Sequence, residues 1–518
     1  MPFFDFHLHP SLKPQMSLPP GFPSPWEIIK IQFAHPSLFT MLLKCGGITE
    51  VVDSQASLTQ LVAGKVNLVA IALHPPESNM MKDDLIVMVA TDEQTHYINI
   101  DRVKAISKGN IYFEMLNDEL KNLSTHLTQN GKQLKLIKKI SEYNAADTNT
   151  VHAILNVEGP HAFYGDREGK TLPAILADFW NNFDSFTTAN RIFAMNIAHL
   201  QDNDFCNHAF GIQIFKVEPF YPNGDGISVH GIKLLEKMKA KNILVDIKHT
   251  SLSARQDLYH YRIGESNWPI VCTHAGLTGI RKKDRGNYFL WNTTLSTGHL
   301  KIRHFKPSGY LKGTSFNPSS INLYDEDVRE IIYSGGLIGL SLDRRILGTP
   351  DLEMLSPDYP DEIFEEEIIS PAEKDFFRNV ERHESDEVLV TDNIRRDDRK
   401  YADIFHARQF LNQVFHLFVI ADEPDEENNN AVINKGLMAK RICIGSDFDG
   451  LINAVECCHD VTEMEAFKKL LLANYKIWEA EFTQRSGCPA LSSFISPQEL
   501  LDNIFYQNAV DFLAVMYQ

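Results

Sequence analysis

The sequence predicts an α/β protein built on a (β/α)8 barrel of the TIM type, with long loop insertions. Eight short apolar segments rich in β-branched residues recur along the 518 residues. Most are continuously apolar rather than alternating, which is typical of parallel strands buried on both faces. The stretches between them are amphipathic, as in 229–241, where apolar residues recur at three- and four-residue spacing. Eight β-α units favour a barrel. An open doubly wound sheet is the alternative, but no glycine-rich phosphate loop follows the first segment.

The first predicted strand carries three ionisable side chains. Alternation along FFDFHLH places Asp5, His7 and His9 on one face, and Pro10 ends the strand because it has no N–H. Two histidines at i and i+2 on a strand can bind one metal ion. The eight predicted strands are residues 3–9, 66–75, 151–159, 191–199, 242–250, 269–276, 336–343 and 441–450.

The excess length over an ordinary barrel lies in three insertions within one domain that spans residues 1–518. They cover about 10–50, 277–325 and 344–440. The first carries Pro and Gly clusters and is expected to be a long loop. The third is expected to be a helical excursion over the barrel mouth, or else a contact in a homo-oligomer.

Two features of the third insertion are specific enough to test. An apolar run near 404–420 predicts a helix. The acidic runs 361–367 and 422–427 are expected to be solvated surface with no ligand implied.

Composition limits the classes of partner. The formal net charge of −18 argues against a nucleic-acid partner. The seven cysteines form no CxxC pair and are odd in number, which indicates reduced thiols. No apolar run approaches the ~20 residues that span a bilayer, and the N-terminus lacks a basic and apolar leader. A cytoplasmic enzyme without a membrane span is the expectation.

Ionisable side chains stand at the ends of six of the eight predicted strands. Each one alone has an ordinary explanation as a satisfied polar group. Burying so many at one end of a barrel is costly without a cation, so the pattern predicts a metal site. The residues are His7 and His9, Glu158, His199, His249, His274, and Asp447 with Asp449.

Around these positions the sequence resembles the membrane (renal) dipeptidase family of the amidohydrolase superfamily. Asp5-Phe-His7 is similar to the family's Asp-x-His-x-Asp, Val157-Glu-Gly-Pro-His161 to its Val-Glu-Gly-Gly-His, and Ala198-His199 to its Leu-Thr-His. Gly224 to Gly231 and Asp246-Ile-Lys-His249 resemble its Gly-Leu-Ser-x-x-Gly and Asp-Leu-x-His, and Thr273-His274 matches its Ser-His. Gly445-Ser-Asp447-Phe-Asp449-Gly450 is similar to its Gly-Gly-Asp-Phe-Asp-Gly, and Asn508-Ala-Val-Asp-Phe-Leu to its closing helix. These motifs occur in the same order along most of the chain.

The resemblance implies two divalent metal ions, with zinc as the expected metal. His7 and His9 would hold the first ion, His249 and His274 the second, and Glu158 would bridge both. A carboxylate suits that role because it offers one oxygen to each ion. Two such ions ~3.5–4 Å apart can share one hydroxide and polarise a carbonyl.

The resemblance also implies catalytic roles for two further residues. His199 would bind the substrate carbonyl and steady the oxyanion, and Asp447 would take a proton from water and return it to the leaving amine. The expected activity is that of a zinc-dependent, dipeptidase-like amidohydrolase that cleaves a small amide or dipeptide bond. The expected partner is a small-molecule substrate.

Two positions depart from the family pattern. Position 9 is His where the family has Asp, which removes one negative charge from the site. Ile321 stands where the family has an Arg that grips the substrate's terminal carboxylate. Arg281, soon after His274, is the candidate replacement for substrate binding, and an exposed loop arginine without that role is the alternative interpretation. The metal-dependent hydrolase is unaffected by these changes, whereas the preference for free dipeptides depends on them.

Two other functions stay open. One is an amidohydrolase that acts on a non-peptide C–N or ester bond, which the altered carboxylate grip favours. The other is a binding protein on a catalytically retired barrel. A retired enzyme would be expected to have lost some of its ligands, but here all are retained apart from the conservative change at His9.

Overall fold

Eight parallel strands follow one another around a single sheet in chain order. The computed structural model describes residues 2–16, 23–30, 53–82, 100–211, 218–263, 268–348, 364–378, 402–426, 428 and 430–518. The sheet order is β1-β2-β5-β6-β7-β8-β11-β13. The strands are β1 (Phe3–Leu8), β2 (Val66–Leu73), β5 (Thr150–Val157), β6 (Ile192–Asn196), β7 (Leu244–Asp246), β8 (Ile270–Ala275), β11 (Ile338–Leu340) and β13 (Ile442–Ile444). Seven lie within their predicted segments, and β5 begins one residue before its segment, at Thr150.

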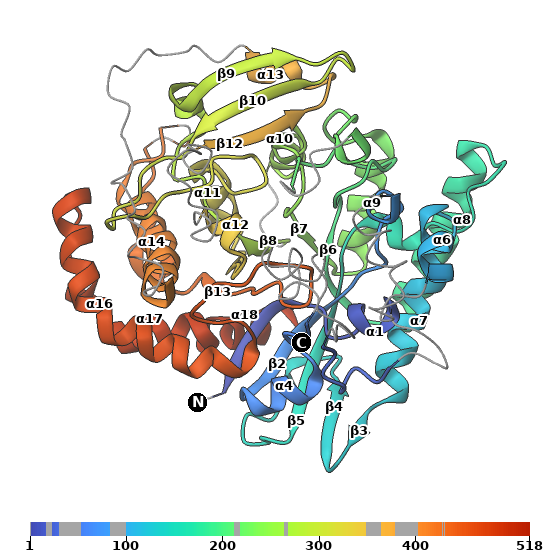
Figure 1. Ribbon diagram of the computed structural model, residues 1–518, viewed down its shortest axis with the longest axis horizontal. Helices are drawn as coiled ribbons and strands as arrows, with labels where there is room; N and C mark the ends of the chain where they lie inside the picture. Colours follow the sequence, from blue (N-terminus) through green and yellow to red (C-terminus); the bar gives the residue numbers. More distant parts are fainter. Residues whose placement is uncertain are drawn as a thin grey trace, which may run out of the picture.

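The last strand returns to the first and closes the sheet into a barrel (Figure 1). Leu8 pairs in parallel with Phe448, just beyond β13. The His9 N–H donates to the Phe448 carbonyl, and the Asp447 N–H donates to the His7 carbonyl, each at 2.9 Å. Closure confirms the predicted (β/α)8 architecture and excludes the open doubly wound sheet.

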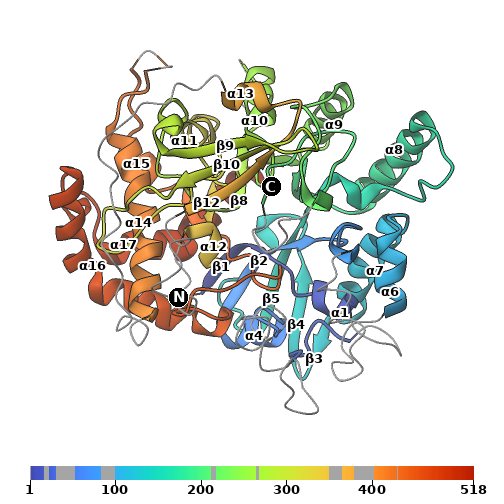
Figure 2. The same cartoon turned by 45° about the horizontal axis from the view of Figure 1, so that its top comes forward.

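Helices cover the outside of the barrel, as Figures 1 and 2 show. The predicted helix at 229–241 is present as α9 (Val229–Ala240). The others are α1 (Leu12–Met16), α4 (Leu58–Ala63), α6 (Ile100–Ser107), α7 (Tyr112–Thr125), α8 (Leu172–Ala189), α10 (Leu252–Tyr261), α11 (Asp325–Tyr333), α12 (Arg344–Leu347), α13 (Lys374–Arg378), α14 (Ala402–Asp422), α15 (Lys435–Met438), α16 (Met464–Ser486), α17 (Pro497–Asp502) and α18 (Asn508–Met516).

A small antiparallel sheet lies apart from the barrel, at the top of Figure 1. It has the order β12-β10-β9. Strands β9 (Phe289–Thr294) and β10 (Leu300–Phe305) come from the predicted insertion 277–325, and β12 (Phe364–Ile369) comes from 344–440. The two insertions therefore meet in one sheet. Within the third insertion, α14 confirms the predicted helix, whereas β12 adds a strand to an excursion that was expected to be helical.

The described part of the acidic run 361–367, residues 364–367, is not the solvated surface that its composition predicts. Its last four residues belong to β12, and the Glu367 side chain is 0% exposed. The Glu367 carboxylate accepts from the Ser320 hydroxyl and lies 3.2 Å from His304 Nε2. Glu365 is buried as well. Alternation along β12 turns these two side chains inward, which charge counting cannot show.

Two further regions complete the description. A hairpin of β3 (Thr128–Gln129) and β4 (Lys132–Leu136), absent from the sequence prediction, adds to the barrel sheet because β4 pairs with β5. The first insertion begins with α1 rather than a loop, and its residues 31–50 lie outside the described part of the chain.

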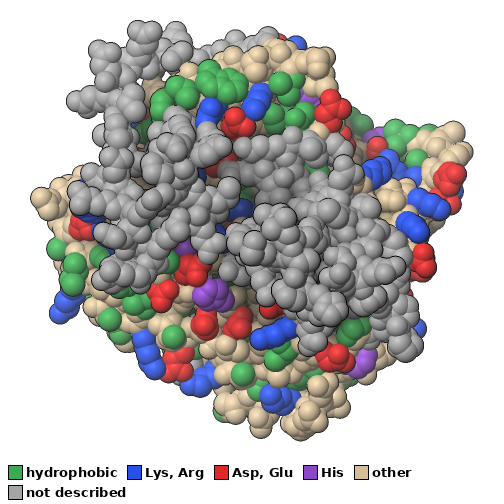
Figure 3. All heavy atoms as spheres, viewed as in Figure 1, with side chains coloured by type: hydrophobic (Ala, Val, Ile, Leu, Met, Phe, Trp, Pro, Cys, Tyr) green, Lys and Arg blue, Asp and Glu red, His purple; other side chains and the backbone are tan. Residues whose placement is uncertain are grey.

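The described residues also show how charge is distributed on the surface (Figure 3) and that the cysteines are not paired. In the described part of the face in Figure 3, Lys and Arg side chains are interspersed with Asp and Glu rather than gathered in one patch. Six cysteines in the described ranges are free thiols. No helix among the described residues is long and apolar enough to cross a bilayer.

Candidate metal centre

Seven of the eight predicted site residues meet at the carboxyl ends of the barrel strands. His7 lies on β1 and His274 on β8, and the others lie one to three residues beyond the ends of their strands. All are buried except Asp447, whose side chain is 15% exposed and is the part of the cluster open to solvent. The seven are His7, His9, Glu158, His199, His249, His274 and Asp447.

The imidazoles form two pairs with the same spacing. His7 Nε2 lies 3.1 Å from His9 Nε2, and His249 Nε2 lies 3.1 Å from His274 Nε2. Two nitrogens that bind one zinc ion tetrahedrally at 2.0–2.1 Å are about 3.3 Å apart. Each pair therefore has the spacing of two ligands of one ion.

The Glu158 carboxylate lies between the two pairs. Oε1 is 3.5 Å from His7 Nε2, 3.3 Å from His249 Nε2 and 3.6 Å from His274 Nε2. Oε2 is 3.4 Å from His9 Nε2. Asp447 Oδ1 completes the first pair at 3.4 Å from His9 Nε2. This position suits the bridging role expected for Glu158, which stays a prediction.

Hydrogen bonds on the far side of the rings leave the Nε2 lone pairs free. His9 Nδ1 donates to the Ala72 carbonyl at 2.9 Å, because a carbonyl can only accept. Thr273 donates its hydroxyl proton to Asp246, so its oxygen accepts from His7 Nδ1 at 2.8 Å. Both neutral rings then direct an Nε2 lone pair into the same space. Hydrogen bonds of this kind orient metal-binding histidines, so the donor set fits a cation.

Burial and charge act in opposite directions within the cluster. Burial lowers the pKa of His9, and it lowers the pKa values of His249 and His274 well below their usual range. Burial also opposes charge on His7, but Glu158, Asp447 and Asp246 raise the pKa of His7. Neutral imidazoles are the form that binds metal ions.

The pKa of Glu158 shifts in the direction that a ligand requires. Burial alone would raise it, but the surrounding histidines, His199 and His7 above all, hold it well below the usual range. The carboxylate is therefore ionised and able to bind cations.

Two of the residues adopt a left-handed backbone that brings their side chains to the centre. His249 has φ 68° and Asp447 has φ 66°. Such conformations cost on the order of 1–3 kcal/mol in residues other than Gly and are concentrated at functional sites. Asp449 also has φ 66°, but its carboxylate accepts from Lys13 Nζ and the Gln55 N–H and lies outside the cluster. Asp449 ties the first insertion to the end of β13.

Arg281 is the predicted residue that the structure does not bring to the cluster. Its Nε donates to Asp284 at 2.7 Å, and its guanidinium lies 3.8 Å from Glu426. Its side chain is 40% exposed. A role for Arg281 in binding substrate stays a prediction.

A second group of buried residues adjoins the cluster and was missed by the sequence analysis. His74 follows β2, Glu77 comes three residues later, and His161 follows Glu158. His199 Nδ1 donates to Glu77 Oε1 in a short hydrogen bond, so Glu77 orients His199. Burial alone would raise the pKa of Glu77, but the histidines around it, His199 first, lower it well below its usual range. His74 could have been found by the strand-end rule that identified the others, whereas no pattern marks Glu77.

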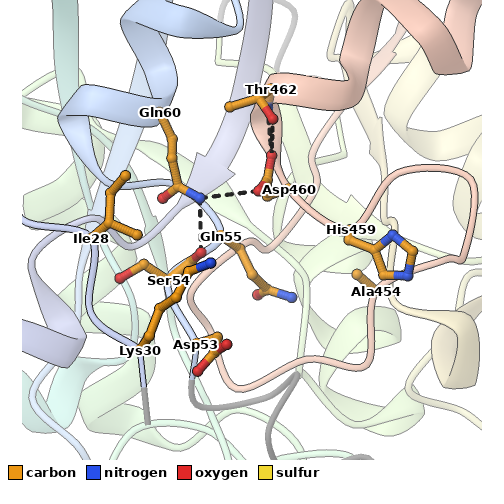
Figure 4. A pocket seen from close by; sticks show the side chains of 10 residues that line it. All are labelled: Ile28, Lys30, Asp53, Ser54, Gln55, Gln60, Ala454, His459, Asp460 and Thr462. Carbon is orange, nitrogen blue, oxygen red and sulfur yellow. Dashed lines mark hydrogen bonds between the residues drawn. The ribbon is translucent and has the colours of Figure 1, made fainter. Parts of the chain in front are cut away.

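A pocket of about 320 Å³ lies elsewhere and contains none of the seven site residues. Figure 4 shows the Gln60 amide donating to Asp460 and to the Ser54 carbonyl at its wall. His459 stands at its other side. The pocket is therefore distinct from the candidate metal centre.

A barrel with paired imidazoles and a carboxylate between them at the carboxyl ends of its strands is the architecture of a metal-dependent enzyme. No family model and no curated protein matches the sequence. Solved structures are similar in fold. One is a metallopeptidase from Rhodobacter sphaeroides liganded with a phosphinate mimic of the dipeptide L-Ala-D-Ala (14% identity, 99% of this chain and 98% of that chain, TM-score 0.49).

Two others carry related names. One is the dipeptidase AC, a metallopeptidase of family M19 (14% identity, 100% of this chain and 99% of that chain, TM-score 0.47). The other is the probable dipeptidase PvdM from Pseudomonas aeruginosa (11% identity, 100% and 96%, TM-score 0.48). These similarities are similarities of fold.

Proposed function

We propose that this protein is a metal-dependent hydrolase of small amides, with dipeptide-like compounds as the leading substrates and zinc as the metal. The observation that carries the proposal is the position of Glu158. Its two carboxylate oxygens lie within 3.6 Å of all four paired imidazoles. Two bound divalent ions would supply the polarisation of a carbonyl and the activation of a water molecule.

Asp447 is suited to move the proton. Its carboxylate lies at the solvent-accessible edge of the cluster, 3.4 Å from His9 Nε2. Hydrolysis of an amide adds water across the C–N bond. Asp447 would accept the proton that the water loses and donate it to the leaving nitrogen, which needs a group within hydrogen-bond distance of both.

His199 is suited to bind the substrate oxygen. Its Nδ1 is held by Glu77, while its Nε2 points to the centre, 3.5 Å from Glu158 Oε1. A ring fixed at one nitrogen presents the other in a defined direction, which lowers the cost of ordering it around the transition state. Because Nδ1 donates to Glu77, Nε2 would donate to the substrate oxygen when the ring is an imidazolium, protonated at both nitrogens.

A buried lysine supports a substrate that carries an anionic group. Lys248 directly precedes His249, and its side chain is 2% exposed. Among the described residues, the contact of its ammonium is the Ile321 carbonyl at 3.5 Å, and no carboxylate lies within 4 Å. Burial lowers the pKa of Lys248, while Asp447 and Asp343 are among the groups that raise it. A buried cation without an anionic partner is costly, and a substrate carboxylate would relieve that cost.

The proposed function is tested by counting metal ions and measuring hydrolysis together. Glu158→Ala should hold two fewer zinc ions per chain than the wild type and lose turnover of small amides. Glu158→Gln should fold equally well and bind the ions more weakly, because a neutral amide is a poor bridge. Full metal content and full rate in Glu158→Ala would refute the proposal.

The substrate class is tested with matched compounds. Free dipeptides should be cleaved faster than their C-terminal amides, and Lys248→Met should remove most of that preference. A charge-assisted hydrogen bond contributes ~1.5–3 kcal/mol, so the expected loss is about ten- to hundred-fold. Arg281→Ala serves as the comparison. If Arg281→Ala removed the preference and Lys248→Met did not, Arg281 rather than Lys248 would bind the substrate carboxylate.

A further inference from the structure

The residues behind His199 form a second group of potential metal ligands. An imidazole nitrogen of His74, one of His161 and a carboxylate oxygen of Glu77 all lie within 4.8 Å of one another. All three side chains are buried. The group shares none of the four paired imidazoles of the centre described above.

Backbone carbonyls determine which nitrogen of each ring carries the proton. His74 Nδ1 lies 3.3 Å from the Glu158 carbonyl, and His161 Nε2 lies 2.7 Å from the Pro75 carbonyl. Because a carbonyl only accepts, each of these nitrogens donates. The neutral rings therefore present a lone pair at His74 Nε2 and at His161 Nδ1. Both face Glu77, at 3.3 Å from Oε2 and 4.0 Å from Oε1 respectively.

Among the described residues, one oxygen of the Glu77 carboxylate accepts hydrogen bonds and the other accepts none. Oε1 accepts from His199 Nδ1 and from the Leu200 N–H at 3.1 Å. Oε2 is buried and has no hydrogen-bond partner among the described residues. With both rings neutral, three acceptor atoms face one dry space, an arrangement that is costly unless a metal ion or a proton lies between them. Burial opposes a charge on His74, but Glu77 and Glu158 raise the pKa of His74 to about 9, so a proton on Nε2 is the alternative to a metal ion.

The geometry favours a metal ion over a proton. The contact of 3.3 Å between His74 Nε2 and Glu77 Oε2 is not aligned as a hydrogen bond, since Oε2 remains without a partner. Two ligands of one ion at 2.0–2.2 Å are about 3.3 Å apart and need no such alignment.

The local backbone leaves room for the His161 ring. Gly159 has φ +87°, and a Cβ there would come within 2.5 Å of His161 Nδ1.

We propose that His74 Nε2, Glu77 Oε2 and His161 Nδ1 bind a further divalent transition-metal ion beside the candidate centre. Two imidazoles and a carboxylate suit a first-row ion such as zinc and leave a position open for water. Glu77 Oε2 would then bind the ion, while Oε1 would accept the hydrogen bond from His199 Nδ1. The site does not depend on hydrolysis, so it can be tested by metal binding alone.

The experiment counts zinc in the full chain after removal of metal and reconstitution with Zn²⁺. The wild type should bind three ions per chain by elemental analysis, and Glu77→Gln should bind two. Glu119→Gln is the matched control. Glu119 is also a buried carboxylate beside His74, and it accepts a hydrogen bond of 2.8 Å from the backbone N–H of His74, but it lies outside the group. This control should keep all three ions.

Two further results decide the matter. His161→Asn should also lose one ion, which keeps the test valid if Glu77→Gln folds poorly. Equal zinc content in the wild type, Glu77→Gln and His161→Asn would overturn the inference. If that shared content were two ions, both lost in Glu158→Ala, the proposed function would stand while the further site would be wrong.

Discussion

His9 shows how one residue change alters the charge of a site without removing a ligand. Its Nδ1 is held by the Ala72 carbonyl, and its Nε2 faces His7. An Asp at this position, as in the family that the motifs resemble, would add a negative charge. With His9, two carboxylates, Glu158 and Asp447, would face two divalent ions. The expected excess of positive charge agrees with the buried ammonium of Lys248 in favouring an anionic substrate.

Asp447→Asn should separate proton transfer from metal binding. An amide keeps the shape of the side chain but cannot accept the proton, so kcat should fall by ~10²–10⁴ while zinc content changes little. Steady-state kinetics with parallel metal analysis measures both. If kcat stayed within a few-fold and only the melting temperature fell, Asp447 would be a structural cap of the loop that follows β13.

The residues that could be predicted are those whose position follows from local periodicity. His7 and Glu158 end apolar runs, and parallel strands of a barrel bring such ends together whatever the connections between them. His74 obeys the same rule. Glu77 does not, because it follows Pro75 and Pro76 in an irregular segment, and its direction is set by contacts with His199 that sequence spacing does not reveal.

At the scale of elements, the pairing of β10 with β12 joins two insertions. Their register places Ile302 opposite Glu367 and Arg303 opposite Glu366. The strand FEEEII has too few apolar residues to be predicted as a strand. Its buried Glu367 is contacted by Ser320 and His304, and Lys306 Nζ lies 3.8 Å from Glu365 Oε2, so only the folded structure reveals the role of these glutamates.

Glu367→Ala should destabilise the small sheet, whereas Glu366→Ala should not. Removing the buried carboxylate leaves the Ser320 and His304 groups without their partner, at a cost of about 1–3 kcal/mol. Glu366 is more exposed and pairs with Lys301 at 3.0 Å, and a surface pair of this kind contributes less than ~1 kcal/mol. Urea unfolding of both variants measures the difference. Equal losses would show that Glu367 is not a buried anchor.

At the scale of the whole molecule, the barrel itself was predictable and its excursions were not. Eight apolar segments with helices between them have few ways to pack, and closure follows from strand number. The insertions lack that constraint, since their strands pair by contacts between distant parts of the chain. Consequently the candidate centre, built on the barrel, could be predicted more completely than the walls around it.

Removal of metal should lower the stability of the whole fold. Ions that bind the native state alone stabilise it by mass action, about 2.7 kcal/mol at a free concentration of 100 times Kd. Chelation should therefore lower the melting temperature, and Zn²⁺ should restore it, with a smaller effect in Glu158→Ala. A melting temperature that is the same with and without chelator would contradict a metal centre in the native protein.

Closure of the barrel by its first and last strands has a consequence for biosynthesis. The Ser446 N–H donates to Asp5 Oδ1 across 441 residues of sequence. During translation β1 leaves the ribosome long before β13 is synthesised. The edge of β1 that later meets the end of β13 therefore stays unpaired until most of the chain has been made. The meeting of His7 and His9 with Asp447 is then a late event, so the nascent chain is expected to need protection from aggregation until the eighth strand is made.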